Sequence, residues 1–267
     1  MRTVAILGLS AMLAACGDPT ASPEEAVANT TAAPPAPAPA PSPPPAAPSR
    51  VKLETDDYSF AYAYPAEAAA IAPLARALDA ERETALAGLK RDTGEWRRET
   101  EKGGFPYRPY ALNIEWKVVT ETPRLLSLSA ETYAYTGGAH GSPGFDALLW
   151  DKAAGKRLAP TELFASAQAI QSAMGDAFCQ RLDRARQGRR GVPVGRSDDP
   201  FNDCPKVAET TLILGSSDGE RIDRVGLLVG PYVAGPYAEG TYDLTLPVTP
   251  AIVAAVRPEW REAFAPR

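Results

Sequence analysis

The sequence predicts an α+β fold in which antiparallel sheets pack against two long helices, arranged as two adjoining subdomains. Three observations lead to this fold class. In several short stretches apolar and polar residues alternate with a period of two, as they do in strands with one buried face. Two longer segments instead repeat apolar residues every three, four or seven positions, which is typical of amphipathic helices. Most strands are separated by short links, which favours antiparallel pairing over β–α–β alternation.

The first predicted elements are a strand and a long helix. Residues 51–65 predict one strand, whose aromatic residues occupy every second position: Tyr58, Phe60, Tyr62 and Tyr64. The helix begins at Pro65 and ends at the glycine pair 103–104. Its apolar stripe, which we expect to face a sheet, comprises Ile71, Leu74, Leu78, Ala85, Leu89 and Trp96. Pro73 lies early enough to be tolerated or to start the main helix afresh.

Most of the remaining elements are strands joined by short turns. Residues 109–120 and 124–136 predict a pair of strands with a turn at Pro123, and a third strand at 145–150 is followed by a turn at 151–156. The second long helix extends from Ser166 to about Arg186, with the apolar residues Ile170, Met174, Phe178 and Leu182. Further strands are expected at 209–214, 221–229 and 241–246. Thr249 then caps a short helix that begins with Pro250.

Two glycine-rich loops stand out as candidate functional elements. The first, residues 135–144, contains the only histidine of the chain, His140, among four glycines and a proline. The second, residues 230–240, is rich in glycine, proline and tyrosine. We expect the loops to pack together, with His140 buried and locking them through both ring nitrogens. An exposed His140 that contacts a partner is the alternative. The candidate binding or locking residues are Tyr135, Gly137, Gly138, His140, Gly141, Tyr232 and Tyr237.

The N-terminal residues predict export. Residues 1–15 form a signal peptide with a short apolar run, too short for the ~20 residues of a membrane-spanning helix. The residues before Cys16 resemble the lipobox of bacterial lipoproteins, which implies that Cys16 becomes the lipid-modified, palmitoylated first residue of the mature protein. A simple signal with a chance cysteine is the alternative. The expected location is the bacterial cell envelope, on the outer membrane facing the periplasm. Residues 16–50, rich in Pro and Ala, predict a disordered tether.

The two other cysteines, Cys179 and Cys204, predict one disulfide, because the protein is exported. The bond would close a loop of about 26 residues and contribute roughly 3 kcal/mol in the chain-entropy model. Residues 188–205, which it would clip, are either a surface for a partner or an inert stapled loop.

The composition argues against several classes of function. The net charge is −5 and no basic run tracks phosphates, so nucleic-acid binding is not expected. One histidine and no free cysteine pair leave too few ligands for a zinc site, and no cofactor or metal is expected. No catalytic constellation is evident, so we expect a protein that is not an enzyme. The alternative is a cell-wall hydrolase or esterase that uses His140 or a carboxylate pair drawn from Glu131, Asp146 and Asp151.

Several motifs together resemble the RsiV/PdaC-like extracellular domain family. They are the YTGGAHG sequence at 135–141, LWD at 149–151, GKRL at 155–158 and the tyrosine-containing loop at 230–240. The resemblance implies a PdaC-like α+β part at 51–135 and an RsiV-like part at 136–267. It also implies a non-catalytic extracellular module, here standing alone on its lipid anchor. The expected ligand is a lysozyme-like protein or peptidoglycan.

Overall fold

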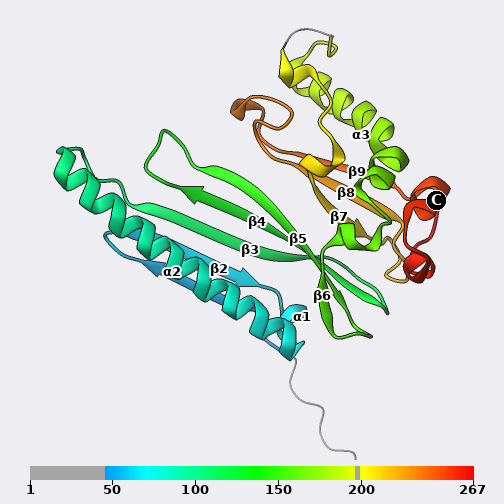
Figure 1. Ribbon diagram of the computed structural model, residues 1–267, viewed down its shortest axis with the longest axis horizontal. Coiled ribbons are helices and arrows are strands. Elements are labelled where there is room, and N and C mark those ends of the chain that lie inside the picture. The colour runs from blue at the N-terminus through cyan, green and yellow to red at the C-terminus, as the bar shows by residue number, and fades with distance from the viewer. Residues whose placement is uncertain (1–45, 196–198) are drawn as a thin grey trace, which may run out of the picture. The chain divides into compact units, whose positions relative to one another are not determined.

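The computed structural model describes residues 46–195 and 199–267 (Figure 1). The signal peptide 1–15, Cys16 and nearly all of the tether 16–50 lie outside the described residues. The described part holds a six-stranded sheet in the order β1-β2-β3-β4-β5-β6 and a three-stranded sheet in the order β7-β8-β9. Two long helices, α2 and α3, accompany these sheets. The predicted α+β class is therefore confirmed.

The large sheet begins with a hairpin where the sequence predicted one strand. β1 (Ser49–Glu54) pairs antiparallel with β2 (Tyr58–Tyr64). The chain turns because the Thr55 hydroxyl accepts hydrogen bonds from the backbone N–H groups of Asp57 (3.2 Å) and Tyr58 (3.0 Å). The single strand predicted at 51–65 is therefore wrong.

A long helix then crosses over the sheet. After the short α1 (Ala66–Ala69), α2 (Ala72–Gly103) has Pro73 in its first turn, where the missing N–H costs nothing. It ends at Gly104, whose φ of 66° is the left-handed conformation that glycine adopts readily. This crossover makes β2 and β3 (Tyr110–Glu121) parallel. The other pairs of described strands are antiparallel.

The rest of the large sheet is a meander. β4 (Leu125–Tyr135) and β5 (Ser142–Asp151) are long, and β5 begins earlier than the predicted residue 145. The predicted turn at 151–156 leads into a short edge strand, β6 (Lys156–Leu158), that the sequence did not indicate.

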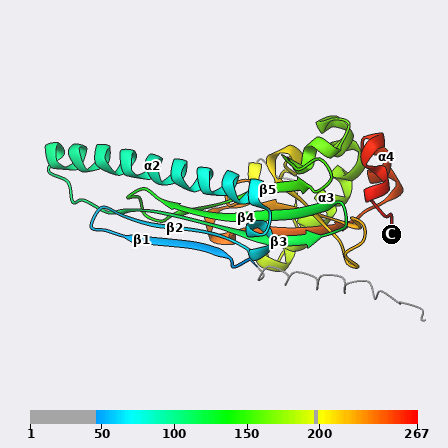
Figure 2. The same cartoon turned by 90° about the horizontal axis from the view of Figure 1, so that it is seen from below.

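The two faces of the large sheet pack into different cores, because successive side chains of a strand point to opposite faces. Leu126, Leu128 and Trp150 belong to the core under α2, which lies along one face of the sheet (Figure 2). Leu125 and Leu149 belong instead to the core formed with the small sheet and α3. β4 and β5 thus connect the two cores.

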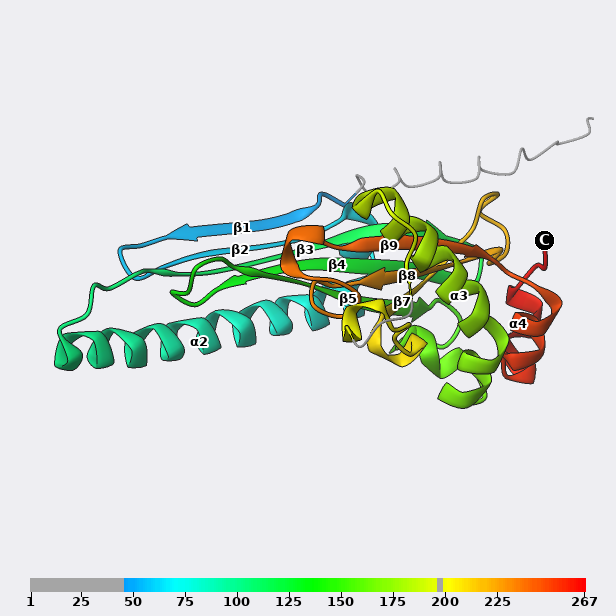
Figure 3. The ribbon, with the colours of Figure 1, turned by 90° about the horizontal axis from the view of Figure 1, so that it is seen from above.

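The small sheet consists of β7 (Thr211–Gly215), β8 (Arg224–Val229) and β9 (Tyr242–Pro247). α3 (Ala167–Arg190) packs beside β9, and Figure 3 shows both next to α4 (Pro250–Ala255). As predicted, Thr249 caps α4, accepting a hydrogen bond from the N–H of Ile252 at 3.3 Å. The described residues also include five short 3-10 helices: Pro160–Leu163, Pro200–Asn202, Val207–Glu209, Tyr237–Glu239 and Pro258–Ala263.

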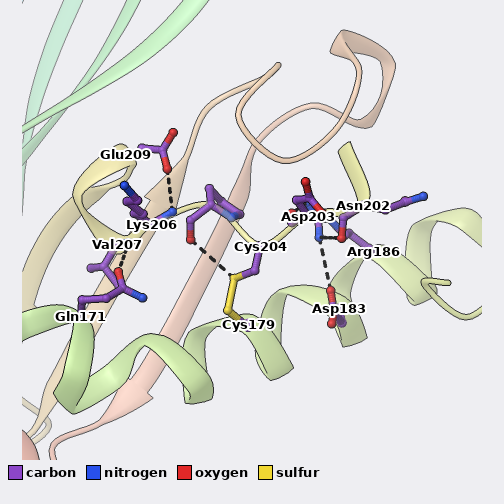
Figure 4. Close-up of a disulfide and its surroundings, with 11 residues drawn as sticks. Gln171, Cys179, Asp183, Arg186, Asn202, Asp203, Cys204, Lys206, Val207 and Glu209 are labelled. Carbon is purple, nitrogen blue, oxygen red and sulfur yellow. Dashed lines mark hydrogen bonds and ion pairs between the residues drawn. A yellow bond between two sulfur atoms is a disulfide. The ribbon is translucent and has the colours of Figure 1, made fainter. Parts of the chain in front are cut away.

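The predicted disulfide is confirmed. Cys179 on α3 is bonded to Cys204, with their Cα atoms 5.5 Å apart. Figure 4 shows the bond clipping the segment around Cys204 onto the helix. Of the helices in the described part, none is both long and apolar enough to cross a bilayer.

Candidate binding site

A groove of about 750 Å³ lies between the face of the large sheet that α2 leaves uncovered and one wall of the small sheet. This volume is within the usual range of ligand pockets, ~300–1,000 Å³. Strands β1 to β5 supply its floor, including Ala61, Ala63 and Phe145. Ile213, Leu228 and the start of β9 supply the wall. The hydroxyl of Thr211, at the start of β7, donates to the carbonyl oxygen of Phe145 at 3.1 Å and so links the small sheet to the floor.

Two acidic side chains of the groove, Glu115 and Glu131, pair with basic groups in and beside it. The Lys117 ammonium lies 3.2 Å from the Glu131 carboxylate and 3.6 Å from that of Glu115, and Arg50 lies 3.4 Å from Glu115. Burial alone lowers the pKa of Lys117, but the hydrogen bonds and charges of Glu131 and Glu115 raise it above its ordinary value. The pairs are solvent-exposed and contribute little stability. They leave a floor without a strong excess of either charge.

An aromatic cluster lies beyond the groove floor, where the two glycine-rich loops meet. We call residues 135–144 the His140 loop and residues 230–240 the Tyr237 loop. The rings of His140 and Tyr237 are stacked, with centroids 3.7 Å apart and planes inclined by 20°. The Tyr232 ring lies 5.9 Å from that of Tyr237. Tyr133, which lines the groove, packs on Gly141 and so joins the cluster to the floor.

The hydrogen bonds of His140 define its tautomer. Nδ1 lies 3.0 Å from the carbonyl oxygen of Gly141, which can only accept, so Nδ1 carries the proton and donates. In the neutral ring Nε2 is then an acceptor, and the Tyr232 hydroxyl lies 3.4 Å from it. Both ring nitrogens are thus directed within the cluster.

Close contacts fix the shape of the His140 loop. A Cβ atom at position 141 would collide with the Tyr133 ring, so any other residue there would displace that ring. Gly137 has a φ of 85°, and Tyr135 donates from its hydroxyl to the carbonyl oxygen of Gly138 at 3.0 Å. The seven candidate residues named from the sequence therefore all lie in or beside this cluster.

His140 itself is exposed, so the expectation that its ring is buried between the loops is wrong. The His140 ring stacks on Tyr237 at the protein surface, where both loops lie. Because the ring is exposed, water can enter the space that it leaves and donate to the Gly141 carbonyl oxygen. We therefore expect His140→Ala to change the free energy of unfolding by no more than about 0.5 kcal/mol, as at ordinary surface positions. Thermal unfolding of the variant beside the parent protein measures this, and a loss above about 1 kcal/mol would contradict it.

The residues that hold the Tyr237 loop were not among the candidates predicted from the sequence. Three arginines near the end of α3, Arg186, Arg189 and Arg190, make these contacts, and we call them the arginine cluster. Arg186 is fully buried and donates from Nε to the carbonyl oxygen of Ala234 at 2.8 Å. Arg190 forms an ion pair with Glu239 at 2.8 Å.

The ion pair makes part of the loop's stability dependent on pH. Burial alone raises the pKa of Glu239, but hydrogen bonds from Arg190 and Tyr242, with the charge of Arg190 and Arg186, hold it below its ordinary value. A lowered folded-state pKa means that the stabilisation is present above the unfolded pKa and is lost as the pH falls through the folded one. We expect the difference in melting temperature between the parent and Glu239→Gln to shrink from about pH 6 to about pH 3. A difference that stays constant would contradict this prediction.

The candidate carboxylates do not form a pair. Glu131 faces the groove and bonds to Lys117, while Asp146 stands opposite Ala130 on the α2 side of the sheet. Burial and the nearby Glu81 raise the pKa of Asp146. Asp151 is buried, and its carboxylate accepts hydrogen bonds from the N–H groups of Ala153 and Ala154, which fixes a turn. Within residues 46–195 and 199–267, no group of three or more His, Cys, Asp or Glu residues could hold a metal ion.

Comparisons with known proteins give a match to the N-terminal part. Residues 51–143 match the family model described as "Deacetylase PdaC". This part, from the first hairpin to the start of β5, is therefore similar to a PdaC domain and includes the His140 loop. None of the curated proteins that were compared matches the chain. The assignment of residues 136–267 to an RsiV-like part stays a prediction.

Two solved structures match over most of the chain. A DUF3298 family protein from Pseudomonas aeruginosa is 17% identical, with a TM-score of 0.48 over 84% of this chain and 99% of that one. A DUF3298 family member from Bacteroides fragilis is 16% identical, with a TM-score of 0.46 over 75% of this chain and 89% of that one.

Proposed function

We propose that this protein is a lipid-anchored module of the bacterial cell envelope that binds a protein or cell-wall ligand without chemistry. The observation that carries the proposal is the groove with its adjoining aromatic cluster. Cys16 would hold the module on the outer membrane, facing the periplasm, and residues 16–50 would act as its tether. The ligand would be a lysozyme-like protein or peptidoglycan.

The exposed aromatic side chains support a binding role. Tyr133 is 40% exposed and Tyr232 is 55% exposed, although both are large side chains that a core could accommodate. Tyrosine offers a broad apolar face with a polar tip and is enriched at the centres of binding surfaces. The similarity of residues 51–143 to PdaC domains supports a role at the cell wall.

The geometry favours binding over catalysis. A hydrolase would need His140 beside a nucleophile, or two carboxylates that share a site. The ring nitrogens of His140 are directed to the Gly141 carbonyl oxygen and the Tyr232 hydroxyl. Glu131 and Asp146 lie on opposite faces of the sheet. Ligand binding, unlike hydrolysis, requires neither a nucleophile beside His140 nor a carboxylate pair.

Co-sedimentation with purified peptidoglycan and titration with lysozyme test the proposal. We expect one of these ligands to bind, and Tyr237→Ala to weaken that binding at least about tenfold, as loss of a central aromatic anchor does. Phe105→Ala is the matched control, because Phe105 is 68% exposed but belongs to neither loop. Absence of binding to both ligands would count against the proposal. Release of soluble fragments from peptidoglycan that is lost in His140→Ala would instead establish a hydrolase.

A further inference from the structure

We infer that Arg186, Arg189 and Arg190 are positioning residues, which hold the Tyr237 loop so that Tyr237 stacks on His140. The inference concerns the free protein, and it rests on the proposed function only where it extends to ligand binding. The three arginines, together with the disulfide, would determine the shape of the aromatic cluster.

The arginine cluster contacts the Tyr237 loop on both sides of Tyr237, at Ala234 and at Glu239. Arg186 and Arg190 both donate to the carbonyl oxygen of Ala234, at 2.8 Å and 3.5 Å. Arg190 also binds both carboxylate oxygens of Glu239, at 2.8 Å and 3.1 Å. Tyr237 lies between these two contacts, so its backbone is fixed on either side.

Arg189 fixes the segment that leads from the loop into the groove wall. Its guanidinium donates to the carbonyl oxygens of Glu239 and Thr241 and lies 3.9 Å from the centroid of the Tyr242 ring. Thr241 lines the groove. The same three arginines therefore connect the groove wall with the aromatic cluster.

The arginine cluster also contacts the segment that the disulfide bonds to α3. Arg186 donates to the carbonyl oxygen of Asp203 at 2.8 Å, next to Cys204 (Figure 4). Arg190 donates to the side-chain oxygen of Asn202 at 2.6 Å. Cys179 lies on the same helix as the arginines. The disulfide therefore holds the residues next to Cys204 close to the arginines that bind them.

The backbone of the Tyr237 loop needs such support. Among residues 46–195 and 199–267, Tyr232 is the one non-glycine residue with a positive φ, 68°. This conformation is unfavourable for an aromatic residue and persists only where the surroundings impose it. A hydrogen bond from its N–H to the carbonyl oxygen of Gly235, at 2.9 Å, closes the turn. The neighbouring Ala234 is the residue whose carbonyl both arginines hold.

NMR spectroscopy of the histidine ring tests the inference directly. The chain has one histidine, so the imidazole signals of a protein carrying no histidine tag belong to His140. In the parent protein we expect cross-relaxation between the His140 and Tyr237 ring protons and an upfield displacement of the His140 signals. In the double variant Arg189→Gln/Arg190→Gln we expect the cross-relaxation to be lost and the signals to move to the position of an unstacked histidine. All spectra are recorded at one fixed pH.

Three further variants separate positioning from general destabilisation. Arg190→Lys, with Arg189 unchanged, should retain part of the displacement. Glu239→Gln weakens the Arg190–Glu239 ion pair by a change in the loop and leaves α3 intact. It therefore tests the positioning role if the double variant does not fold. Arg181→Gln is the matched control, because Arg181 lies on the same helix and donates to the carbonyl oxygen of Thr245, outside the loop. We expect its His140 signals to be unchanged.

The possible outcomes distinguish this inference from the proposed function. Unchanged cross-relaxation in a folded double variant, or in Glu239→Gln when the double variant is unfolded, would overturn the inference. An equal change in Arg181→Gln would also overturn it. Peptidoglycan and lysozyme binding is measured on the same samples. If the parent binds neither, the proposed function fails while the NMR result still decides the positioning role.

Discussion

Replacing Arg186 with methionine is expected to lower the free energy of unfolding by about 2–3 kcal/mol, near the upper end of the cost of leaving a buried carbonyl oxygen without its charged donor. Arg186 is 0% exposed. It donates to the carbonyl oxygens of Ala234 and Asp203, each at 2.8 Å, and lies 3.3 Å from the Asp183 carboxylate. Methionine fills much of the same space with an apolar chain. The carbonyl of Ala234 would then face a group that cannot donate.

Urea unfolding of the parent and Arg186→Met measures this loss. Arg181→Met is the control, because Arg181 is an exposed arginine on the same helix that also donates to a backbone carbonyl oxygen, that of Thr245. We expect the control to cost less than about 1 kcal/mol, as surface substitutions usually do. A loss for Arg186→Met as small as the control's would show that water or a shifted loop satisfies the freed carbonyls.

The long helices could be predicted from the sequence because their signals are local. The apolar stripe of α2 has its 3.6-residue period, Pro73 fits its first turn and Gly104 ends it. The β1–β2 hairpin could not be predicted in the same way. Its turn at Thr55 and Asp57 contains neither glycine nor proline, and it depends on hydrogen bonds that the Thr55 hydroxyl accepts from backbone N–H groups. β6 escaped prediction because a strand of three residues has too little periodicity.

The candidate site was only partly predictable. Glycine content and tyrosines pointed to both loops, and the structure brings His140 and Tyr237 together. Exposure of the His140 ring depends on how far each loop projects, which no local pattern encodes. The arginine cluster donates hydrogen bonds to loop residues and Thr241, 44 to 52 positions away, beyond the reach of periodicity. One signal was present, however: Arg186 follows Cys179 by seven residues and Arg190 follows Arg186 by four, spacings that place all three on one helix face.

Removing the disulfide with Cys179→Ser and Cys204→Ser together is expected to destabilise the protein by about 3 kcal/mol in the chain-entropy model. For a chain of this size that corresponds to a fall in melting temperature of about 6–12 °C. The bond links α3 to the segment before β7, which the arginine contacts and the hydrogen bond from the Val207 N–H to the Gln171 side chain also connect to the helix. Its loss acts mainly on the unfolded chain, which gains freedom between the two positions.

Thermal unfolding of both proteins with and without a thiol reductant measures this effect and provides its own control. We expect the reduced parent to melt at the temperature of the double variant, and the double variant to be insensitive to reductant. A parent whose melting temperature is unchanged by full reduction, verified by thiol titration, would contradict the prediction. A double variant that melts well below the reduced parent would indicate that the serine hydroxyls are buried without partners, since Cys179 and Cys204 are each only partly exposed. Cys179→Ala with Cys204→Ala distinguishes that case, because alanine carries no hydroxyl and retains only the loss of the cross-link.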